Sequence, residues 1–266
     1  MADDVEVLHG GVANAGEVVR IGEQVVRPAP SNAETIHRLL RHLAGSGLEI
    51  APEPLSLADG RERLRFIPGD VPIPPYPDWA QSDEVLASIT SLIRALHEAS
   101  RQFRHHGDDV WSTELADARA RGPVVCHNDV CLENVVFRAG TAVALLDFDY
   151  AAPGRPSHDL ACFARMCVPI DDDTSSADLG WSSAHGPSRL RLIVDVYGCT
   201  SVERSEIIDS LDDAIGHGGE FVQRHAEAGE SGFVEMWASL GGMARFDRRR
   251  EWWGRRRDEF AASLEK

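Results

Sequence analysis

Residues 124–154 read VVCHNDVCLENVVFRAGTAVALLDFDYAAPG. Two apolar segments, 134–138 and 142–147, are separated by a short turn that contains a glycine, and this pattern predicts an antiparallel β-hairpin. In such a hairpin, residues whose numbers sum to about 280 face each other across the two strands. Asn134 and Asp147 should therefore lie at the open end of the hairpin, within the roughly 5 Å that separates a cross-strand pair.

The polar residues at this end of the hairpin predict a site for a metal-bound phosphate. An amide oxygen from Asn134 and a carboxylate from Asp147 suit Mg²⁺, which prefers hard oxygen ligands and usually shares its coordination sphere with phosphate and water. Asp129 lies shortly before Asn134, in a loop expected at the same end. Its carboxylate can accept the proton of an attacking hydroxyl, and general-base help of this kind is typically worth about 10²–10⁴-fold in rate.

This arrangement resembles a known family. His127-Asn128-Asp129, with Asn134 shortly after it and Asp147-Phe148-Asp149 after an apolar strand, looks like the catalytic and metal loops of the aminoglycoside phosphotransferase and choline kinase family. The members of that family are relatives of protein kinases. Asn128 stands where the family more usually has glycine, which should alter the backbone of the loop without removing the base.

Other segments resemble the same family in the same order along the chain. The run GRPSHDLA at 154–161 is similar to its characteristic continuation, and GGVAN at 10–14 is similar to its nucleotide loop. The runs GDVP at 69–72 and DFDYAAPG at 147–154 look most like a trifolitoxin-immunity-like branch of phosphotransferases. The helical remainder of the chain fits the C-terminal lobe of the family.

The resemblance implies a role for each matched residue of the catalytic and metal loops. Asp129 would be the catalytic base and His127 would support the catalytic loop. Asn134 and Asp147 would hold Mg²⁺, whereas Asp149 would reach a second metal or cap a turn. Asp159 would brace the catalytic loop, as the corresponding Asp does in the family.

The resemblance also implies a site for ATP or GTP as co-substrate. Its contacts would come from the first turn, from the third strand and from the segment that leads into the linker: Gly10, Gly11, Asn14, Arg27, Phe66 and Ile67. The single lysine of the chain is Lys266, so a cation on the phosphates has to be another group, and Arg27 stands where the family has Lys or Arg. Glu34 is the acid expected to pair with Arg27, although His37 competes for that position by its spacing.

The sequence on either side predicts two lobes in an α+β, protein-kinase-like fold. Residues 1–67 predict three strands, one helix and a second hairpin, a small β-rich lobe for nucleotide binding. Residues 68–78 are rich in proline and predict a hinge or linker. Residues 79–266 predict a larger, mainly helical lobe for catalysis and substrate binding, with a loop at 171–186.

Composition excludes several classes of protein. The chain has 43 acidic and 27 basic residues and a net charge of −16, which argues against nucleic-acid binding and suits either a cationic substrate or simple solubility. No apolar run reaches the roughly 20 residues of a membrane span, and the acidic start MADDVEV is no secretory signal. The five cysteines should be free thiols in the cytoplasm. The oligomeric state is left open by the sequence.

Two charged segments have alternative interpretations. Asp171-Asp172-Asp173 could contact a cationic substrate, but a solvated loop is the preferred interpretation. The arginine-rich segment 245–257 could bind nucleic acid or another anion, and we expect it to dock against acidic residues of the same chain.

The sequence thus predicts a magnesium-dependent small-molecule phosphotransferase. It would move the γ-phosphate of ATP or GTP to a hydroxyl of its substrate, with an aminoglycoside-like or other cationic antibiotic as the leading class. The alternative is a non-catalytic binding or immunity protein of the same fold that sequesters its ligand. The presence of Asp129, Asn134 and Asp147 together favours the enzyme.

Overall fold

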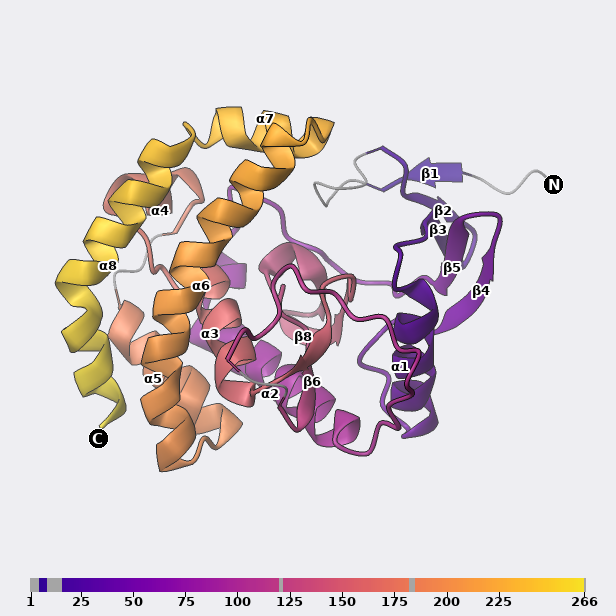
Figure 1. Cartoon of the computed structure of the whole chain (residues 1–266), viewed down its shortest axis with the longest axis horizontal. Helices are drawn as coiled ribbons and strands as arrows, with labels where there is room; N and C mark the ends of the chain where they lie inside the picture. Colours follow the sequence, from indigo (N-terminus) through magenta and orange to yellow (C-terminus); the bar gives the residue numbers. More distant parts are fainter. Residues whose placement is uncertain (1–4, 9–15, 120–121, 182–184, 266) are drawn as a thin grey trace.

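The computed structural model describes residues 5–8, 16–119, 122–181 and 185–265 (Figure 1). The chain begins with a five-stranded antiparallel sheet in the order β1-β2-β3-β5-β4. The strands are β1 (Val5–Val7), β2 (Val19–Ile21), β3 (Gln24–Pro28), β4 (Pro54–Ala58) and β5 (Arg61–Arg65). The meander and the second hairpin predicted from the sequence are both present.

Helix α1 (Ala33–Gly45) lies between β3 and β4 in sequence and packs against β4 and the following helix. Its buried apolar residues recur at helical spacing, as the sequence predicts: Ile36, Leu39, Leu40 and Leu43. Gly47 follows the helix with φ 76°, a left-handed conformation that glycine adopts without steric cost and that ends helices.

The hairpin predicted from the opening stretch consists of β7 (Val135–Arg138) and β8 (Thr141–Leu145). Val135 faces Leu145 and Val136 faces Ala144, so the first pairs sum to 280 as expected, before an irregularity shifts the register by one residue. A second antiparallel pair, β6 (Val124–Cys126) with β9 (Ala152–Gly154), encloses the loops on either side of the hairpin.

The proline-rich segment joins the sheet to the hairpin. Asp70 and Phe137 exchange two backbone hydrogen bonds of 2.8 Å. The backbone can approach this closely because residue 69 is glycine, since a Cβ there would lie 2.4 Å from Cγ1 of Val136. The linker is therefore held against the hairpin.

The remainder is helical. The helices are α2 (Asp83–Ser100), α3 (Pro156–Cys167), α4 (Asp173–Asp178), α5 (Gly186–Tyr197), α6 (Ser201–Glu227), α7 (Ser231–Ser239) and α8 (Met243–Leu264). Figure 1 shows the sheet and α1 at one end, the hairpin strands in the middle and α4 to α8 at the other end. The short helix α4 lies where the sequence predicts a loop, and its first turn is capped by Asp172, whose side chain accepts a hydrogen bond from Ser175 N at 3.2 Å.

One large apolar core runs through the molecule, from α1 and β5 through α2 and the hairpin to α5 and α8. A smaller apolar cluster lies where α6, α7 and α8 meet, around Val222, Phe233 and Phe246. Among the described helices, none is both long enough and apolar enough to span a membrane.

Candidate active site

The loop between β6 and β7 and the loop after β8 bring three of the predicted polar residues to one cavity. Asp129, Asn134 and Asp147 all line a cavity of about 200 Å³ beside the hairpin. The side-chain amide of Asn134 donates to Asp129, at 2.9 Å to its backbone oxygen and 3.1 Å to Oδ2. With its nitrogen engaged in this way, the side-chain oxygen of Asn134 is the atom that it can offer to a cation.

Asp159 holds the backbone of this loop. Its Oδ2 accepts hydrogen bonds from His127 N at 2.9 Å and from His97 Nε2 at 2.8 Å, and its Oδ1 accepts one from Asn128 N at 2.7 Å. Burial alone would raise the pKa of Asp159, but the hydrogen bond and charge of His97 lower it, so the carboxylate is ionised. A fully buried carboxylate with three donors fixes the conformation of the loop.

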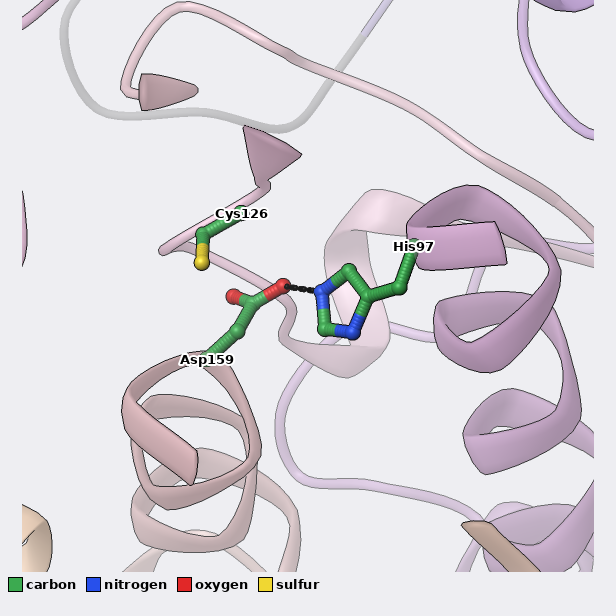
Figure 2. A group of neighbouring side chains, drawn as sticks. All are labelled: His97, Cys126 and Asp159. Atoms are coloured by element: carbon green, nitrogen blue, oxygen red, sulfur yellow. Dashed lines mark hydrogen bonds and ion pairs between the residues drawn. The ribbon is translucent and has the colours of Figure 1, made fainter. Parts of the chain in front are cut away.

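Figure 2 shows His97, Cys126 and Asp159 together, with ligand-type atoms within 4.8 Å of one another. This trio does not fit a metal centre. Asp159 is already saturated by donors, and burial raises the pKa of the Cys126 thiol well above its ordinary value, which disfavours the thiolate that a metal needs. The three residues belong to the brace of the loop.

His127 and Asn128 are both buried, and the side chain of each donates a hydrogen bond to a backbone carbonyl. His127 Nε2 donates to Leu146 O at 2.8 Å, and burial lowers the pKa of His127, so the ring is neutral. Asn128 has φ 68°, in the left-handed region that favours glycine and that asparagine also tolerates. Its side-chain amide donates to Tyr150 O at 2.9 Å. The asparagine thus adopts a conformation that glycine would also allow.

The carboxyl group of Asp129 has an unusual proton affinity. Burial, together with the negative charge of Asp147, raises its pKa to about 7, and the charge of Arg165 opposes this only in part. A carboxyl group with a pKa near neutrality is a better proton acceptor than an ordinary aspartate. It also lies at the cavity, where a substrate hydroxyl can reach it.

Arg27 lies at the centre of a second group of acids, which we call the Arg27 cluster: Arg27, Glu62, Asp147 and Asp149. Arg27 is 8% exposed, and its guanidinium donates to Glu62 Oε1 at 2.6 Å, to Asp147 Oδ1 at 2.9 Å and to Asp149 Oδ1. Burial alone would lower the pKa of Arg27, but the charges of the three carboxylates raise it above its ordinary value. The cluster joins the sheet to the loop after β8.

The acid that pairs with Arg27 is Glu62 and not Glu34, which corrects the expectation from the sequence. Glu34 is exposed on α1, whereas Arg27 and Glu62 are direct neighbours across β3 and β5. His37 takes the inward position on α1 and binds the other carboxylate oxygen of Glu62, with 2.7 Å between Nε2 and Oε2. The carboxylate that pairs with Arg27 therefore comes from β5 and not from α1, and His37 connects this carboxylate to α1.

The Arg27 cluster and Asn134 fit a divalent cation. Asp147 and Asp149 share a single guanidinium. Burial and the charge of Asp147 raise the pKa of Asp149 to about 7, as expected where negative charges lie close together. Asp147 has φ 59°, a left-handed conformation that is uncommon for a residue other than glycine. These carboxylates and the Asn134 oxygen are hard donors of the kind that Mg²⁺ prefers.

The residues predicted for nucleotide binding are not all placed by the structure. Gly10, Gly11 and Asn14 lie outside the described residues. Phe66 and Ile67 are half-buried at the start of the linker, and the guanidinium of Arg20 lies over the Phe66 ring at 3.8 Å.

Two residues at the site were missed by the sequence analysis. Glu62 carried a signal, because it alternates in phase with the buried Leu64 on β5, and a charge on the inward face of a strand needs a partner. Arg165 lines the cavity from α3, among neighbours that are largely apolar. The signal for Arg165 was a charged residue in a helix whose other residues are nearly all buried.

The sequence is similar to known proteins across the region of the site. A sequence model described as the phosphotransferase enzyme family matches residues 108–193. The trifolitoxin immunity protein of Rhizobium leguminosarum bv. trifolii is 30% identical over 248 residues, which cover 90% of this chain and 91% of that protein.

The fold is similar to solved phosphotransferases. The complex of aminoglycoside phosphotransferase APH(2″)-IIIa with GDP and kanamycin has a TM-score of 0.62 at 14% identity, with 94% of each chain covered. Choline kinase from Cryptosporidium parvum Iowa II has a TM-score of 0.63 at 13% identity, over 99% of this chain and 92% of that one. At this identity the likeness establishes the two-lobe kinase-like fold.

Proposed function

The chain belongs to the phosphotransferase enzyme family, and from this premise we propose that it transfers the γ-phosphate of ATP or GTP to a hydroxyl group of a small molecule. The observation that carries the proposal is the convergence of Asp129, Asn134 and Asp147 on one cavity, with Arg27 bound to Asp147. A proton acceptor, hard metal ligands and a cation for phosphate lie within one site. Phosphoryl transfer needs little more than such positioning and charge neutralisation.

Asp129 is the proposed general base. The hydroxyl oxygen of the acceptor forms a bond to the γ-phosphorus while the bond from that phosphorus to the bridging oxygen breaks. The hydroxyl proton passes to Asp129, and the nucleoside diphosphate leaves. The raised pKa of Asp129 supports this role, and the backbone brace at Asp159 holds the carboxylate in place.

Asn134 and Asp147 are the residues that would hold Mg²⁺, with Asp149 as a further ligand. When bound, the ion would neutralise charge on the phosphates. Arg27 already contacts Asp147 and Asp149, so a small rotation of its guanidinium would bring it to phosphate oxygens beside the metal. Glu62 on β5 holds Nε of that guanidinium, and His37 on α1 binds the other carboxylate oxygen of Glu62.

We propose the division of labour that the sequence predicts. Residues 1–67 would form the nucleotide-binding lobe, with the segment 66–67 beside the base. Residues 68–78 would be the hinge, and 79–266 the catalytic and substrate-binding lobe. The backbone bonds between Asp70 and Phe137 support a hinge that is anchored on the hairpin.

The alternative is a non-catalytic protein that sequesters its ligand. The relative that is named an immunity protein motivates it. The complete set of acids at the cavity supports phosphotransfer instead, because a binding protein has no use for a base and metal ligands aimed at the same point. Immunity by phosphorylation of a toxin would satisfy both observations.

Nucleotide binding tests the proposal directly. We expect Mg·ATP or Mg·GTP to bind with a Kd below the millimolar range by calorimetry, and Asp129→Asn to retain that binding. Turnover is then measured as nucleotide consumption against a panel of hydroxylated acceptors. If neither nucleotide binds at millimolar concentration, the protein is no phosphotransferase. If Asp129→Asn turns over an acceptor as fast as wild type, Asp129 is not the base.

A further inference from the structure

A cluster of arginines lies next to the cavity, with Arg165 in its lining. Asp171 is 3% exposed, and its Oδ2 accepts from Arg245 Nη2 at 2.7 Å and lies 2.8 Å from Arg249 Nη2. Burial lowers the pKa of Arg249 to about 10, and the positive charges of Arg165 and Arg245 add to this effect. We call these four residues the Arg165 cluster: Arg165, Asp171, Arg245 and Arg249.

Arg165 is the member that reaches the cavity. It lies in the last turn of α3 and lines the same cavity as Asp129. Its Nη1 would lie 2.6 Å from a Cβ on Gly218, so the absence of a side chain on α6 makes room for the guanidinium. The arrangement points a cation at the site where the acceptor has to bind.

Arg165 has no carboxylate partner among the described residues. Its Nε is buried without a hydrogen bond, and no acid lies within 4.0 Å of its guanidinium in the part of the chain that the structure describes. The buried arginines Arg27, Arg189 and Arg249 each have such a partner. The chain has a net charge of −16, so a guanidinium without a carboxylate partner is unusual in it. Beside a cavity, such a guanidinium can bind an anionic ligand.

The other walls of the cavity are mainly apolar. Their apolar side chains are Leu115, Met166, Phe221, Val222, Phe233 and Met236. Glu133 also lines the cavity, and its Oε2 accepts a hydrogen bond of 2.9 Å from the Tyr76 hydroxyl. The rings of Phe221 and Tyr150 meet edge to face at 5.4 Å, as do those of Phe221 and Phe233. A compact molecule with an apolar body fits these walls. Asp147 is bound to Arg27 and Glu133 to Tyr76, so Arg165 is the charged group, among the described residues of the lining, that is free to pair with such a molecule.

We propose that the acceptor is a compact hydroxylated molecule with an apolar body and an oxyanion, a carboxylate or a phosphate, which Arg165 binds. This inference rests on the proposed function, because it concerns the acceptor side of the same site. It replaces the expectation of a cationic acceptor, which was based on the net charge of the whole chain. The oxyanion and the guanidinium would pair while the hydroxyl of the same molecule lies at Asp129.

The test uses a matched set of probes built on one scaffold. Tropate carries a phenyl ring, a hydroxymethyl group and a carboxylate; tropamide replaces the carboxylate by an amide. The corresponding primary amine and the corresponding phosphate monoester complete the set. Binding to the full chain is measured by calorimetry, with and without Mg·ATP.

We expect wild type to bind tropate or the phosphate monoester at least about tenfold more tightly than tropamide, and the amine least tightly. Arg165→Met keeps the length and the apolar stem of the side chain, and it should reduce that preference to within about twofold. Arg250→Met removes the same charge from an exposed position on α8 and should leave the preference unchanged. The contrast between the two variants isolates the guanidinium at the cavity.

Three outcomes would overturn the inference: no oxyanion probe binds at millimolar concentration, the amine binds most tightly, or Arg165→Met weakens Mg·ATP binding while leaving the preference among probes intact. The last outcome would assign Arg165 to the nucleotide. Failure of the proposed function is separate, since it would appear as loss of nucleotide binding. The preference for an oxyanion can be measured without nucleotide.

Discussion

The Arg27 cluster and the Arg165 cluster are opposite in charge balance. In the first, three carboxyl groups surround one guanidinium. In the second, the guanidiniums of Arg245 and Arg249 share the carboxylate of Asp171, and the charge of Arg165 acts on Arg249 without an acid of its own within 4.0 Å among the described residues. Both clusters act on Asp129, because the charge of Asp147 raises its pKa and that of Arg165 lowers it. The difference shows that a net charge of −16 says little about the sign of any one wall of the site.

The excess negative charge of the first cluster suits a divalent cation, and the excess positive charge of the second suits an anion. Each imbalance is costly in a buried site, because an uncompensated charge loses its hydration. Binding of Mg·nucleotide on one side and of an anionic acceptor on the other would relieve both. Without its ligands, the protein would then carry uncompensated charge at the two places where they bind.

The largest expected effect comes from Asp129, where the two clusters meet. Asp129→Asn keeps the shape of the side chain and removes the base, so we expect kcat to fall by about 10²–10⁴-fold with little change in the Kd of Mg·ATP. Steady-state kinetics and calorimetry on the same preparation check this. A fall in nucleotide affinity that matches the fall in kcat would mean that Asp129 serves binding.

Removal of Arg27 should break the first cluster. Arg27→Met leaves Glu62, Asp147 and Asp149 without their cation, so we expect the free energy of unfolding to fall by about 3–5 kcal/mol in the absence of Mg²⁺. Urea unfolding measures this. Arg27→Lys keeps the charge and should recover part of the stability and of the nucleotide affinity. A fully stable Arg27→Met protein would refute a structural role for the cluster.

A smaller effect is expected when the support of Arg27 is weakened and its charge is kept. Glu62→Gln should raise the KM for nucleotide about tenfold, equivalent to roughly 1–2 kcal/mol, with kcat nearly unchanged. Glu34→Gln is the matched control, because Glu34 is exposed on α1 and should change KM by less than about twofold. Equal effects of the two variants would contradict the pairing of Arg27 with Glu62.

The smallest effect concerns stability and pH. The pKa of Asp129 is about 7 in the folded protein against an ordinary value of 3.8, so the folded state binds the proton more tightly and loses stability as pH rises through this window. The stability of Asp129→Asn relative to wild type should therefore rise between about pH 4 and about pH 8, and the two proteins should be equally stable below about pH 4. Thermal unfolding without metal at several pH values checks this. A constant difference across pH would show that Asp129 does not titrate in this window.

Much of the fold could be predicted because it depends on local patterns. The alternation and the turn in residues 134–147 fixed the hairpin and its first pairs, and the helical spacing of Ile36 and Leu39 located α1. The residues of the catalytic and metal loops lie close together in sequence, so their convergence followed from one hairpin. Arg27 was identified because the single lysine of the chain is Lys266 and because this arginine, on the predicted third strand, stands where the resembled family has Lys or Arg.

The rest depends on contacts between distant segments. Arg27 and Glu62 are 35 residues apart, and the choice of Glu62 over Glu34 was made by the pairing of β3 with β5. Asp171, interpreted from the sequence as part of a solvated loop, is buried under α8 by Arg245, 74 residues away. The arginine-rich segment does dock against acids of the same chain, as expected, among them Asp171, Asp209 and Asp212.

The sequence by itself determined the kinase-like fold, the family and the group of acids that a phosphate and its metal would meet, because short-range spacing carries that information. Only the tertiary structure decided which acid holds Arg27 and which side of the cavity is positive. The physical reason is that a local electrostatic field sums charges brought together from distant segments. Asp129 was visible in the sequence, whereas the opposite charges on its two sides exist only in the folded chain.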